Sequence, residues 1–311
     1  MESKELQRNK CDIESIMNEL LFQYKENPVD LLSIGDHERE YAYISRCMNT
    51  YIRTVNDIAQ MVPENRESKK ILEIGSFLGI VSIALSRLGF NVTASDVPEY
   101  ISCKNLQSKF NDNHVDYIGC NLRDYNLPFN DEEFDIVIMC ETLEHLNFNP
   151  LPVIKEINRV LKRQGLFYIT VPNIARKKNR LKLIRGESIL NPVDDFFLAL
   201  NGTRNTSIGI HWREYTRNEI KEILERMNFA IIKQEYEKDS IKRPPGLKGL
   251  VIKVIRYFLH LERIRRLVIA NLFDPGLDSD LIRTLITFAS KSETCAHKFC
   301  IKDLLFPESR K

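Results

Sequence analysis

The sequence has no long apolar run, and this absence limits the class of protein. No stretch approaches the ~18 uncharged apolar residues that a membrane-spanning helix requires. The opening residues, Met1-Glu2-Ser3-Lys4, lead into no apolar segment and offer no glycine for myristoylation. We therefore expect a cytoplasmic protein, whose only membrane contact would be peripheral, at the inner face.

Paired cysteines and an excess of one charge are also lacking. The seven cysteines are scattered, and Cys120 and Cys140 lie inside apolar runs that are typical of reduced core thiols. Cys295, His297 and Cys300 offer only three ligands, too few for a structural zinc site. The 45 basic residues nearly balance the 43 acidic ones, so the net charge argues neither for nor against nucleic acid, which is not an expected partner. A hydrophobic content of 43% predicts a globule with a substantial core.

Short apolar runs alternate with helical patterns through the middle of the chain. Strands are predicted at Ile71–Gly75, Asn91–Asp96, Val115–Cys120, Phe134–Cys140 and Leu166–Val171. Helices are predicted at 79–88, 98–110 and 150–163, the last after the capping pair Asn149-Pro150. This alternation favours right-handed βαβ units and a parallel sheet.

The flanking segments complete the expected organisation. Residues 1–66 predict an N-terminal helical extension, in which Asp36 caps a helix that ends before Pro63. A capping box at Thr216-x-x-Glu219 opens a later helix, followed by strands at Phe229–Tyr236 and Leu285–Ala289. We expect a main domain over 67–292, with insertions at 174–215 and 241–280 and a tail at 293–311.

Two glycines and an acid follow the first two predicted strands. The first strand runs into Glu73-Ile74-Gly75-Ser76-Phe77-Leu78-Gly79, and the second ends at Asp96, close to the ~20-residue spacing of an acid that binds ribose hydroxyls. The dinucleotide pattern G-x-G-x-x-G would need glycines where Phe77 and Ile80 stand, which disfavours a nicotinamide cofactor. Taken alone, the two glycines could equally be turn glycines.

Residues 71–172 resemble class I methyltransferases, which depend on S-adenosylmethionine (SAM). The resemblance rests on Glu73-x-Gly75-x-x-x-Gly79, Ser95-Asp96, Asn121-Leu122, Leu127-Pro128-Phe129, Phe134-Asp135-Ile136-Val137, Glu141-Thr142-Leu143-Glu144-His145-Leu146, Arg159-Val160-Leu161-Lys162 and Ile169-Thr170-Val171-Pro172-Asn173. It implies a doubly wound, mostly parallel seven-stranded α/β sheet of the Rossmann-like kind. In that sheet the strand near 283–290 would run antiparallel beside the strand near 229–236.

The resemblance also implies a set of cofactor-binding residues: Glu73, Gly75, Ser76, Gly79, Asp96, Val97, Asn121 and Leu122. Glu73 would lie near the ammonium group of SAM, and the loop 75–79 along its methionine part. Asp96 would bind the ribose, Val97 would face the adenine, and Asn121-Leu122 would reach its edge. Phe77 and Asn121 depart from the family's usual glycine and aspartate. These departures leave open a catalytically inactive cofactor-binding subunit.

The segment Glu141-x-x-Glu144-His145 follows the fourth predicted strand, at the sheet edge where doubly wound folds bind substrate. Similar segments bind a divalent metal in ubiquinone-type O-methyltransferases, so the three residues could hold Mg²⁺ or a similar ion. Alternatively, His145 is a metal-free base with a pKa near neutrality. A third interpretation is that Glu144 and His145 only cap and orient the loop.

Two further features suggest the acceptor. Six basic residues follow the fifth strand and would attract a phosphate-bearing or lipid-linked acceptor, unless they form an ordinary solvated helix face: Arg176, Lys177, Lys178, Arg180, Lys182 and Arg185. His211-Trp212-Arg213-Glu214-Tyr215-Thr216 resembles a segment of methyltransferases found with bacterial surface-polysaccharide enzymes. His211 is thus a second candidate base or metal ligand, and Trp212 either stacks on a sugar or anchors the core.

These features predict methylation of a hydroxyl on a glycan or glycolipid precursor in polysaccharide biosynthesis, with a small metabolite as the alternative acceptor. Residues 244–273 carry a basic amphipathic pattern. It suits an anionic membrane surface, a partner protein, or a helix packed on the domain.

Overall fold

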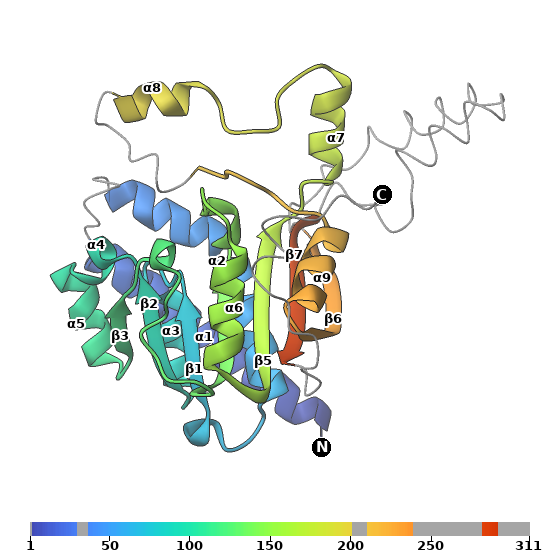
Figure 1. Ribbon diagram of the computed structural model, residues 1–311. Helices are drawn as coiled ribbons and strands as arrows, with labels where there is room; N and C mark the ends of the chain where they lie inside the picture. Colours follow the sequence, from blue (N-terminus) through green and yellow to red (C-terminus); the bar gives the residue numbers. More distant parts are fainter. Residues whose placement is uncertain (1, 30–36, 201–209, 239–281, 292–311) are drawn as a thin grey trace.

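The computed structural model describes residues 2–29, 37–200, 210–238 and 282–291. Seven strands form one sheet in the order β3-β2-β1-β4-β5-β7-β6, in which β7 alone runs antiparallel to its neighbours (Figure 1). The strands are β1 (Lys70–Ile74), β2 (Asn91–Asp96), β3 (Asp116–Gly119), β4 (Phe134–Cys140), β5 (Leu161–Pro172), β6 (Phe229–Lys238) and β7 (Ile282–Lys291). The predicted fold class and the antiparallel β6–β7 pair are confirmed.

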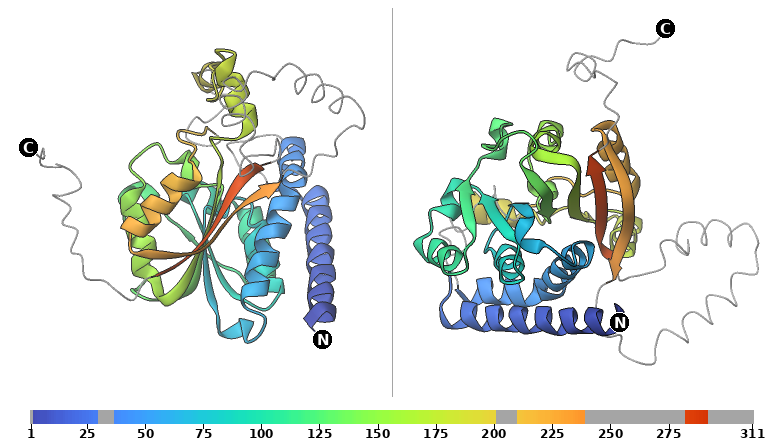
Figure 2. Two further views of the ribbon diagram at one scale, coloured as in Figure 1. Left: turned by 90° about the vertical axis from the view of Figure 1, so that its right-hand side faces the viewer. Right: turned by 90° about the horizontal axis from the view of Figure 1, so that it is seen from below.

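Helices cover both faces of this sheet. They are α1 (Glu2–Glu26), α2 (His37–Met61), α3 (Ile80–Arg87), α4 (Pro98–Ile101), α5 (Lys104–Asp112), α6 (Leu151–Val160), α7 (Lys177–Ile184), α8 (Asp194–Leu200) and α9 (Arg217–Arg226), with 3-10 turns η1 (Arg66–Ser68), η2 (Leu122–Asp124) and η3 (Leu143–His145). Seen edge-on, α1, α2 and α3 lie on one side of the sheet and α6 and α9 on the other (Figure 2).

Alternate residues of the central strands belong to two separate hydrophobic cores. In β4, Ile136 and Ile138 pack with α1, α2 and α3, whereas Val137 and Met139 pack with α6 and α9. Successive side chains of a strand point to opposite faces, so a strand buried on both sides reads as a continuous apolar run. Each fully buried aliphatic side chain contributes about 1.5–3 kcal/mol. The sheet is therefore a rigid base for the loops at its edge.

The N-terminal helices are joined to the main sheet by side-chain hydrogen bonds. The Tyr24 hydroxyl of α1 donates to the backbone carbonyl of Leu78, in the loop after β1. From β5, the Tyr168 hydroxyl donates to Asp57 of α2 at 3.1 Å, and Arg53 donates to the same carboxylate at 2.8 Å. The extension therefore packs as a layer of the fold, while Asp36, its predicted cap, lies outside the described residues.

Two predicted helices have the wrong length. The predicted helix 98–110 is two helices. The first, α4, ends at Ile101, where the hydroxyl of the following Ser102 donates to the Glu99 carbonyl, and α5 starts at Lys104. The predicted helix 150–163 ends at Val160, and β5 begins at the next residue. The backbone of residues 132–134 hydrogen-bonds and pairs with residues 159–161, which converts the last predicted turn into strand.

The predicted insertion at 174–215 contains α7 and α8, which lie above the carboxyl ends of the central strands (Figure 1). Its two ends adjoin each other: Asn173 and Tyr215 form a bridge, and the Ile174 amide donates to the Tyr215 carbonyl at 3.1 Å. The predicted segments 241–280, 244–273 and 293–311, with Cys295, His297 and Cys300, lie outside the described residues. The domain boundaries remain a prediction. No helix of the described part is long and apolar enough to cross a membrane.

Candidate functional site

The loop after β1 turns sharply at two glycines whose missing side chains leave room for neighbours. Gly75 and Gly79 have φ of +76° and +72°, a region that favours glycine. A Cβ on Gly75 would lie 2.2 Å from the Thr142 hydroxyl, and one on Gly79 would lie 2.3 Å from the ring of Phe110. Gly79, a predicted cofactor-binding residue, also leaves room for the Phe110 ring.

Asp96 joins this loop to the end of β2. Its two carboxylate oxygens accept the Phe77 and Val97 amides, each at 2.7 Å. Desolvation raises the pKa of the half-buried carboxyl to about 6 despite these two bonds. Each oxygen keeps a second lone pair, which can accept a ribose hydroxyl. Asp96 is therefore held in place by the backbone and still suits the predicted role.

Buried polar groups in the same loop are suited to a charged ligand. Glu73 is 4% exposed and accepts the Ser82 hydroxyl of α3, and burial raises the pKa of this carboxyl to about 8. The Ser76 hydroxyl is buried without a hydrogen-bond partner. Unpaired buried groups are rare unless they bind something. This loop therefore fits the amino-acid end of SAM, whose ammonium would favour the ionised form of Glu73.

Phe77 and Asn121, which depart from the usual residues of the family, have different structural roles. The Phe77 ring packs edge-on against Tyr43 of α2 at 5.4 Å and Tyr100 of α4 at 5.5 Å, between centroids. Its φ of 48° explains why glycine is usual here. The Asn121 side chain caps η2 by accepting the Arg123 amide at 3.1 Å, which leaves its amide group for an adenine edge beside Leu122.

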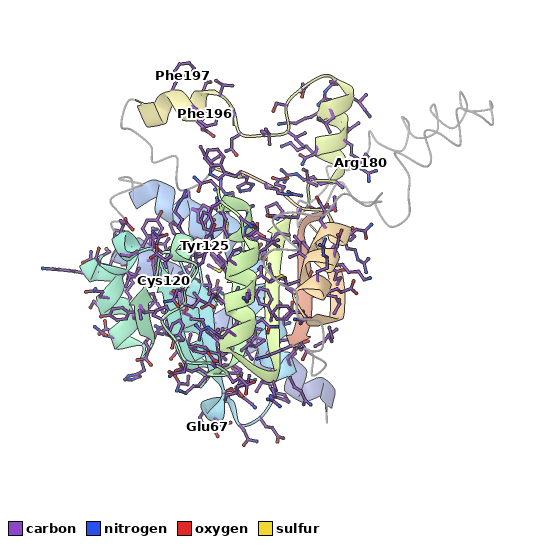
Figure 3. The ribbon with its side chains drawn as sticks, in the orientation of Figure 1. Glu67, Cys120, Tyr125, Arg180, Phe196 and Phe197 are labelled. Atoms are coloured by element: carbon purple, nitrogen blue, oxygen red, sulfur yellow. The ribbon has the colours of Figure 1, made fainter. Side chains whose placement is uncertain are left out.

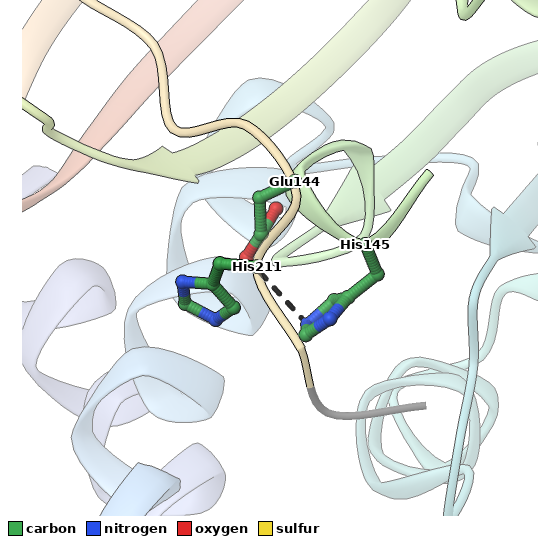
Figure 4. A group of neighbouring side chains, drawn as sticks. All are labelled: Glu144, His145 and His211. Atoms are coloured by element: carbon green, nitrogen blue, oxygen red, sulfur yellow. Dashed lines mark ion pairs between the residues drawn. The ribbon is translucent and has the colours of Figure 1, made fainter. Parts of the chain in front are cut away.

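Glu144 and His145 of η3 meet His211 from the far end of the insertion (Figure 4). One ligand atom from each of these residues lies within 4.8 Å of the others, and the two imidazole rings are 4.8 Å apart between centroids. The Trp212 amide donates to the Glu144 carbonyl at 2.8 Å, which fixes the two segments together. Both predicted bases therefore lie in one cluster.

Each histidine of this cluster has one ring nitrogen fixed by a partner. His145 Nδ1 lies 3.0 Å from the Ile210 carbonyl, and His211 Nδ1 lies 3.0 Å from Glu214 Oε1. Both partners accept hydrogen bonds, so the Nδ1 atoms carry the protons and the Nε2 atoms are left as bases or ligands. Burial and the neighbouring His211 lower the pKa of His145 to about 4. The expectation of a pKa near neutrality for His145 was therefore wrong.

The residues that could hold a metal ion together differ from the predicted ligand set by one residue. Glu141 is not part of the cluster of Glu144, His145 and His211, and its carboxylate instead accepts the Thr170 hydroxyl of β5 at 3.2 Å. Its φ of 48° turns the chain directly after β4. Glu144 is fully buried, and neither carboxylate oxygen has a hydrogen-bond partner. Burial, then the nearby Glu141, raises the pKa of Glu144 well above its ordinary value.

Trp212 is 41% exposed, so it does not anchor the core. Its ring lies 6.5 Å from that of Phe196 on α8. It also lines a groove of about 1070 Å³ between α6, α9 and the 146–150 loop. No predicted cofactor-binding residue and neither histidine lines this groove. This groove is therefore separate from the histidine cluster and from the predicted cofactor-binding loops.

Three residues of the site were missed from the sequence. Glu214 was visible only as a letter of the His211–Thr216 motif, three positions after the histidine that it binds. Tyr43 of α2 was not predicted as a site residue, yet burial, and then the charges of nearby groups that include Glu141 and Glu144, raise its pKa. Asn173 directly follows β5, with its amide nitrogen buried and without a hydrogen-bond partner, and the sequence analysis included it only as the last residue of the motif Ile169–Asn173.

Asp96→Ala should weaken SAM binding by at least about tenfold, since a charge-assisted hydrogen bond contributes roughly 1.5–3 kcal/mol. The loss should be larger if the freed Phe77 and Val97 amides let the loop move. Calorimetry with SAM measures the effect, and Asp112→Ala, an exposed aspartate at the end of α5, is the control. A folded Asp96 variant with unchanged affinity would remove this residue from the site.

Comparison with known proteins identifies the family. A family model described as a methyltransferase domain matches residues 38–234, more than half of the chain. The ubiquinone biosynthesis O-methyltransferase of Actinobacillus pleuropneumoniae (serotype 5b, strain L20) is 28% identical over 138 residues, 43% of this chain and 58% of that protein. That of Hydrogenovibrio crunogenus is 31% identical over 128 residues, 41% and 52% of the two chains. This chain therefore spans little more than half the length of these relatives.

A solved structure from Galdieria sulphuraria, described as a sarcosine dimethylglycine methyltransferase, has a TM-score of 0.51 at 15% identity. The match covers 88% of this chain and 98% of that one, and it shows likeness of fold. The family match and the strand order agree with each other. The chain belongs to the methyltransferase-domain family, and its sheet has the doubly wound order expected of class I methyltransferases.

Proposed function

We propose that this chain transfers a methyl group from SAM to a hydroxyl group of an acceptor and that His211 removes the proton of that hydroxyl. The observation that carries the proposal is the bond between His211 Nδ1 and Glu214, which leaves Nε2 to accept a proton. Bound SAM supplies an electrophilic methyl group on its sulfonium. The chain aligns the two reactants, and the base makes the acceptor oxygen more nucleophilic.

Glu214 is suited to stabilise the imidazolium that forms when His211 takes the proton. Burial tends to raise the pKa of Glu214, but the His211 bond and the charge of Arg176, at 3.5 Å, outweigh it and lower the pKa. Glu214 is therefore ionised at neutral pH. His145, whose pKa is lowered to about 4, is a weak proton acceptor at neutral pH, so we assign it a positioning role.

The acceptor class is part of the proposal. The exposed ring of Trp212 and the basic residues of α7 favour a hydroxyl on a glycan or glycolipid precursor, phosphate- or lipid-linked. The names of the curated relatives favour a hydroxyl in ubiquinone biosynthesis. A small metabolite is a further alternative, in which the basic residues are incidental.

Isotopically labelled SAM distinguishes these acceptors. The enzyme is incubated with separate glycolipid, quinone-precursor and small-metabolite extracts, and mass spectrometry locates the label. Label on oxygen in one fraction identifies the acceptor class. Label on nitrogen or carbon would contradict O-methylation. SAM binding by calorimetry without demethylated cofactor in any fraction would favour an inactive binding subunit.

A metal-assisted reaction is the second candidate. The buried carboxylate of Glu144 has no hydrogen-bond partner, and it lies beside two imidazoles whose Nδ1 atoms are fixed by Ile210 and Glu214. Fixing the second nitrogen in this way is typical of metal-binding histidines. One carboxylate and two imidazoles suit a transition ion better than the predicted Mg²⁺, which prefers oxygen ligands.

The metal candidate predicts that excess chelator abolishes turnover and that a divalent ion restores it. Activity is measured in chelator and after titration with Mn²⁺, Zn²⁺ or Mg²⁺. Glu144→Gln should abolish the restoration while leaving SAM affinity intact. Full activity in chelator would exclude a metal role and leave the His211 base.

A further inference from the structure

The groove between α6, α9 and the 146–150 loop begins beside the histidine cluster. Its lining includes Leu146 and Trp212, which directly follow His145 and His211 in the chain. Consecutive Cα atoms are ~3.8 Å apart, so the groove wall starts next to both histidines. The groove volume of about 1070 Å³ is close to the upper end of the ~300–1,000 Å³ that is usual for small-molecule sites. The groove therefore has room for a ligand that extends from the cluster.

The charged side chains that line the groove are balanced. Three arginine–glutamate pairs, with 2.7–3.1 Å between nitrogen and oxygen, include six of the seven charged lining residues: Arg159–Glu156, Arg213–Glu219 and Arg226–Glu222. The seventh is Lys155, and Arg159 also pairs at 2.8 Å with Asp131, outside the lining. These eight side chains carry four charges of each sign, so they provide no excess of one sign to attract a charged ligand.

Four asparagines supply uncharged hydrogen-bonding groups to the lining: Asn147, Asn149, Asn158 and Asn228. The side-chain oxygen of Asn147 accepts from Arg123, and that of Asn149 accepts the Leu151 amide at 3.1 Å, so each keeps its NH₂ group as a donor. Asn228 is exposed, and its side-chain amide both donates and accepts. This polar lining suits an uncharged ligand that is rich in hydroxyl groups.

Aromatic rings form part of the same surface. Trp212, which is 41% exposed, and Phe148 both line the groove. The exposed rings of Phe196 and Tyr125, labelled in Figure 3, lie 6.5 Å from Trp212 and 5.8 Å from Phe148 between centroids. A pyranose ring packs its C–H groups on an aromatic ring while its hydroxyls bond to polar side chains. Amide groups together with exposed aromatic rings therefore suit sugars.

We infer that this groove binds uncharged sugar units of a glycan, adjacent to the unit that is methylated. Stacking on Trp212 and hydrogen bonds to the asparagine amides hold these units, while the next unit reaches His211. The position of the reacting hydroxyl rests on the proposed function, but sugar binding in the groove does not require methyl transfer. A wholly apolar ligand would cover the amide groups without bonding to them, which is unfavourable.

Trp212 is the only tryptophan of the sequence, so tryptophan fluorescence reports on this groove. The full chain is titrated with neutral hexasaccharides of glucose, mannose, galactose or N-acetylglucosamine, by fluorescence and by calorimetry. We expect a saturable change in emission with at least one of them, and little effect of salt, since the ligand is uncharged. The inference fails if none of the four changes the emission or releases heat of binding, or if salt abolishes the binding.

Asn147→Ala with Asn228→Gly should weaken this binding by at least about fivefold, because each neutral hydrogen bond contributes roughly twofold to tenfold. Glycine fits at position 228, where φ is +64°. Trp212→Leu should weaken the binding by roughly tenfold, measured by calorimetry. Asn111→Ala with Asn65→Gly is the matched control: both residues are exposed and outside the groove lining, and Asn65 also has a left-handed φ, of 54°. Equal affinity in the parent and both groove variants would contradict the inference.

Methyl transfer tests the proposed function separately. If a hexasaccharide binds in the groove but labelled SAM transfers no label to any glycan, the proposed function fails and the groove remains a sugar site. If both groove variants methylate a glycan with the KM of the parent, the groove inference fails and the proposed function stands.

Discussion

His211→Gln should lower turnover by roughly 10²–10⁴ while SAM affinity stays nearly unchanged, because the base acts only as the acceptor loses its proton. Glutamine preserves the approximate size of the side chain and removes its ability to accept a proton. Turnover is measured as demethylated cofactor released, and SAM affinity by calorimetry. His114→Asn is the control, because His114 is exposed in a left-handed turn that asparagine tolerates.

The pH–rate profile separates the two histidines of the cluster. With its pKa held near 4, His145 stays neutral across pH 5–9, so it would produce no acid limb in that range. An acid limb that the His211→Gln variant loses would assign the base to His211. If His145→Gln alone removed the activity, our assignment would be reversed. If both variants turned over like the parent across pH 5–9, neither histidine would be the base.

Gly79→Ala should lower the free energy of unfolding by about 2–4 kcal/mol. The left-handed backbone opposes a Cβ, and the new methyl group would lie 2.3 Å from Phe110, so overpacking adds about 1–3 kcal/mol. Gly89→Ala is the matched control for the backbone effect: its φ is +93°, but no atom lies within 4 Å of the added Cβ. Denaturant unfolding measures both variants.

A second substitution tests whether the Phe110 ring causes the loss. Phe110→Leu removes the atom nearest to the added methyl group, so Gly79→Ala should cost less in that background. A coupling of about 1 kcal/mol or more would support the packing role. If Gly79→Ala left stability unchanged and lowered only SAM affinity, Gly79 would instead be required by the ligand.

The sheet and the sharp turn after β1 were predictable because their signals are local. A strand buried on both faces, such as β4, is a continuous apolar run, and the interval from Gly75 to Asp96 reflects one βαβ unit. The break at Ser102 and the early end of α6 depend on a local hydroxyl bond and on pairing with residues 132–134. The periodicity of apolar residues, from which the helices were predicted, carries no information about this hydroxyl bond or this strand pairing.

The histidine cluster was only half predictable. His145 and Ile210 are 65 positions apart, and they meet through one hydrogen bond from a ring nitrogen to a backbone carbonyl. The sequence identified both histidines as candidates from separate motifs. Their contact, the exclusion of Glu141 and the lowered pKa of His145 all depend on burial and on the path of the chain between the motifs, which no spacing rule describes.

The bridge between Asn173 and Tyr215 makes the intervening segment a closed excursion from the sheet. Because it leaves and returns at adjacent points, its length and sequence can change without stretching β5 or displacing α9. The predicted cofactor-binding loops after β1 and β2 lie outside this segment, whereas His211 and Glu214 lie close to its C-terminal end. On the proposed function, donor recognition would thus be fixed in the scaffold, and acceptor choice would reside in a segment that can be exchanged. Grafting residues 176–209 from another family member should therefore redirect the enzyme to a new acceptor while SAM affinity is preserved.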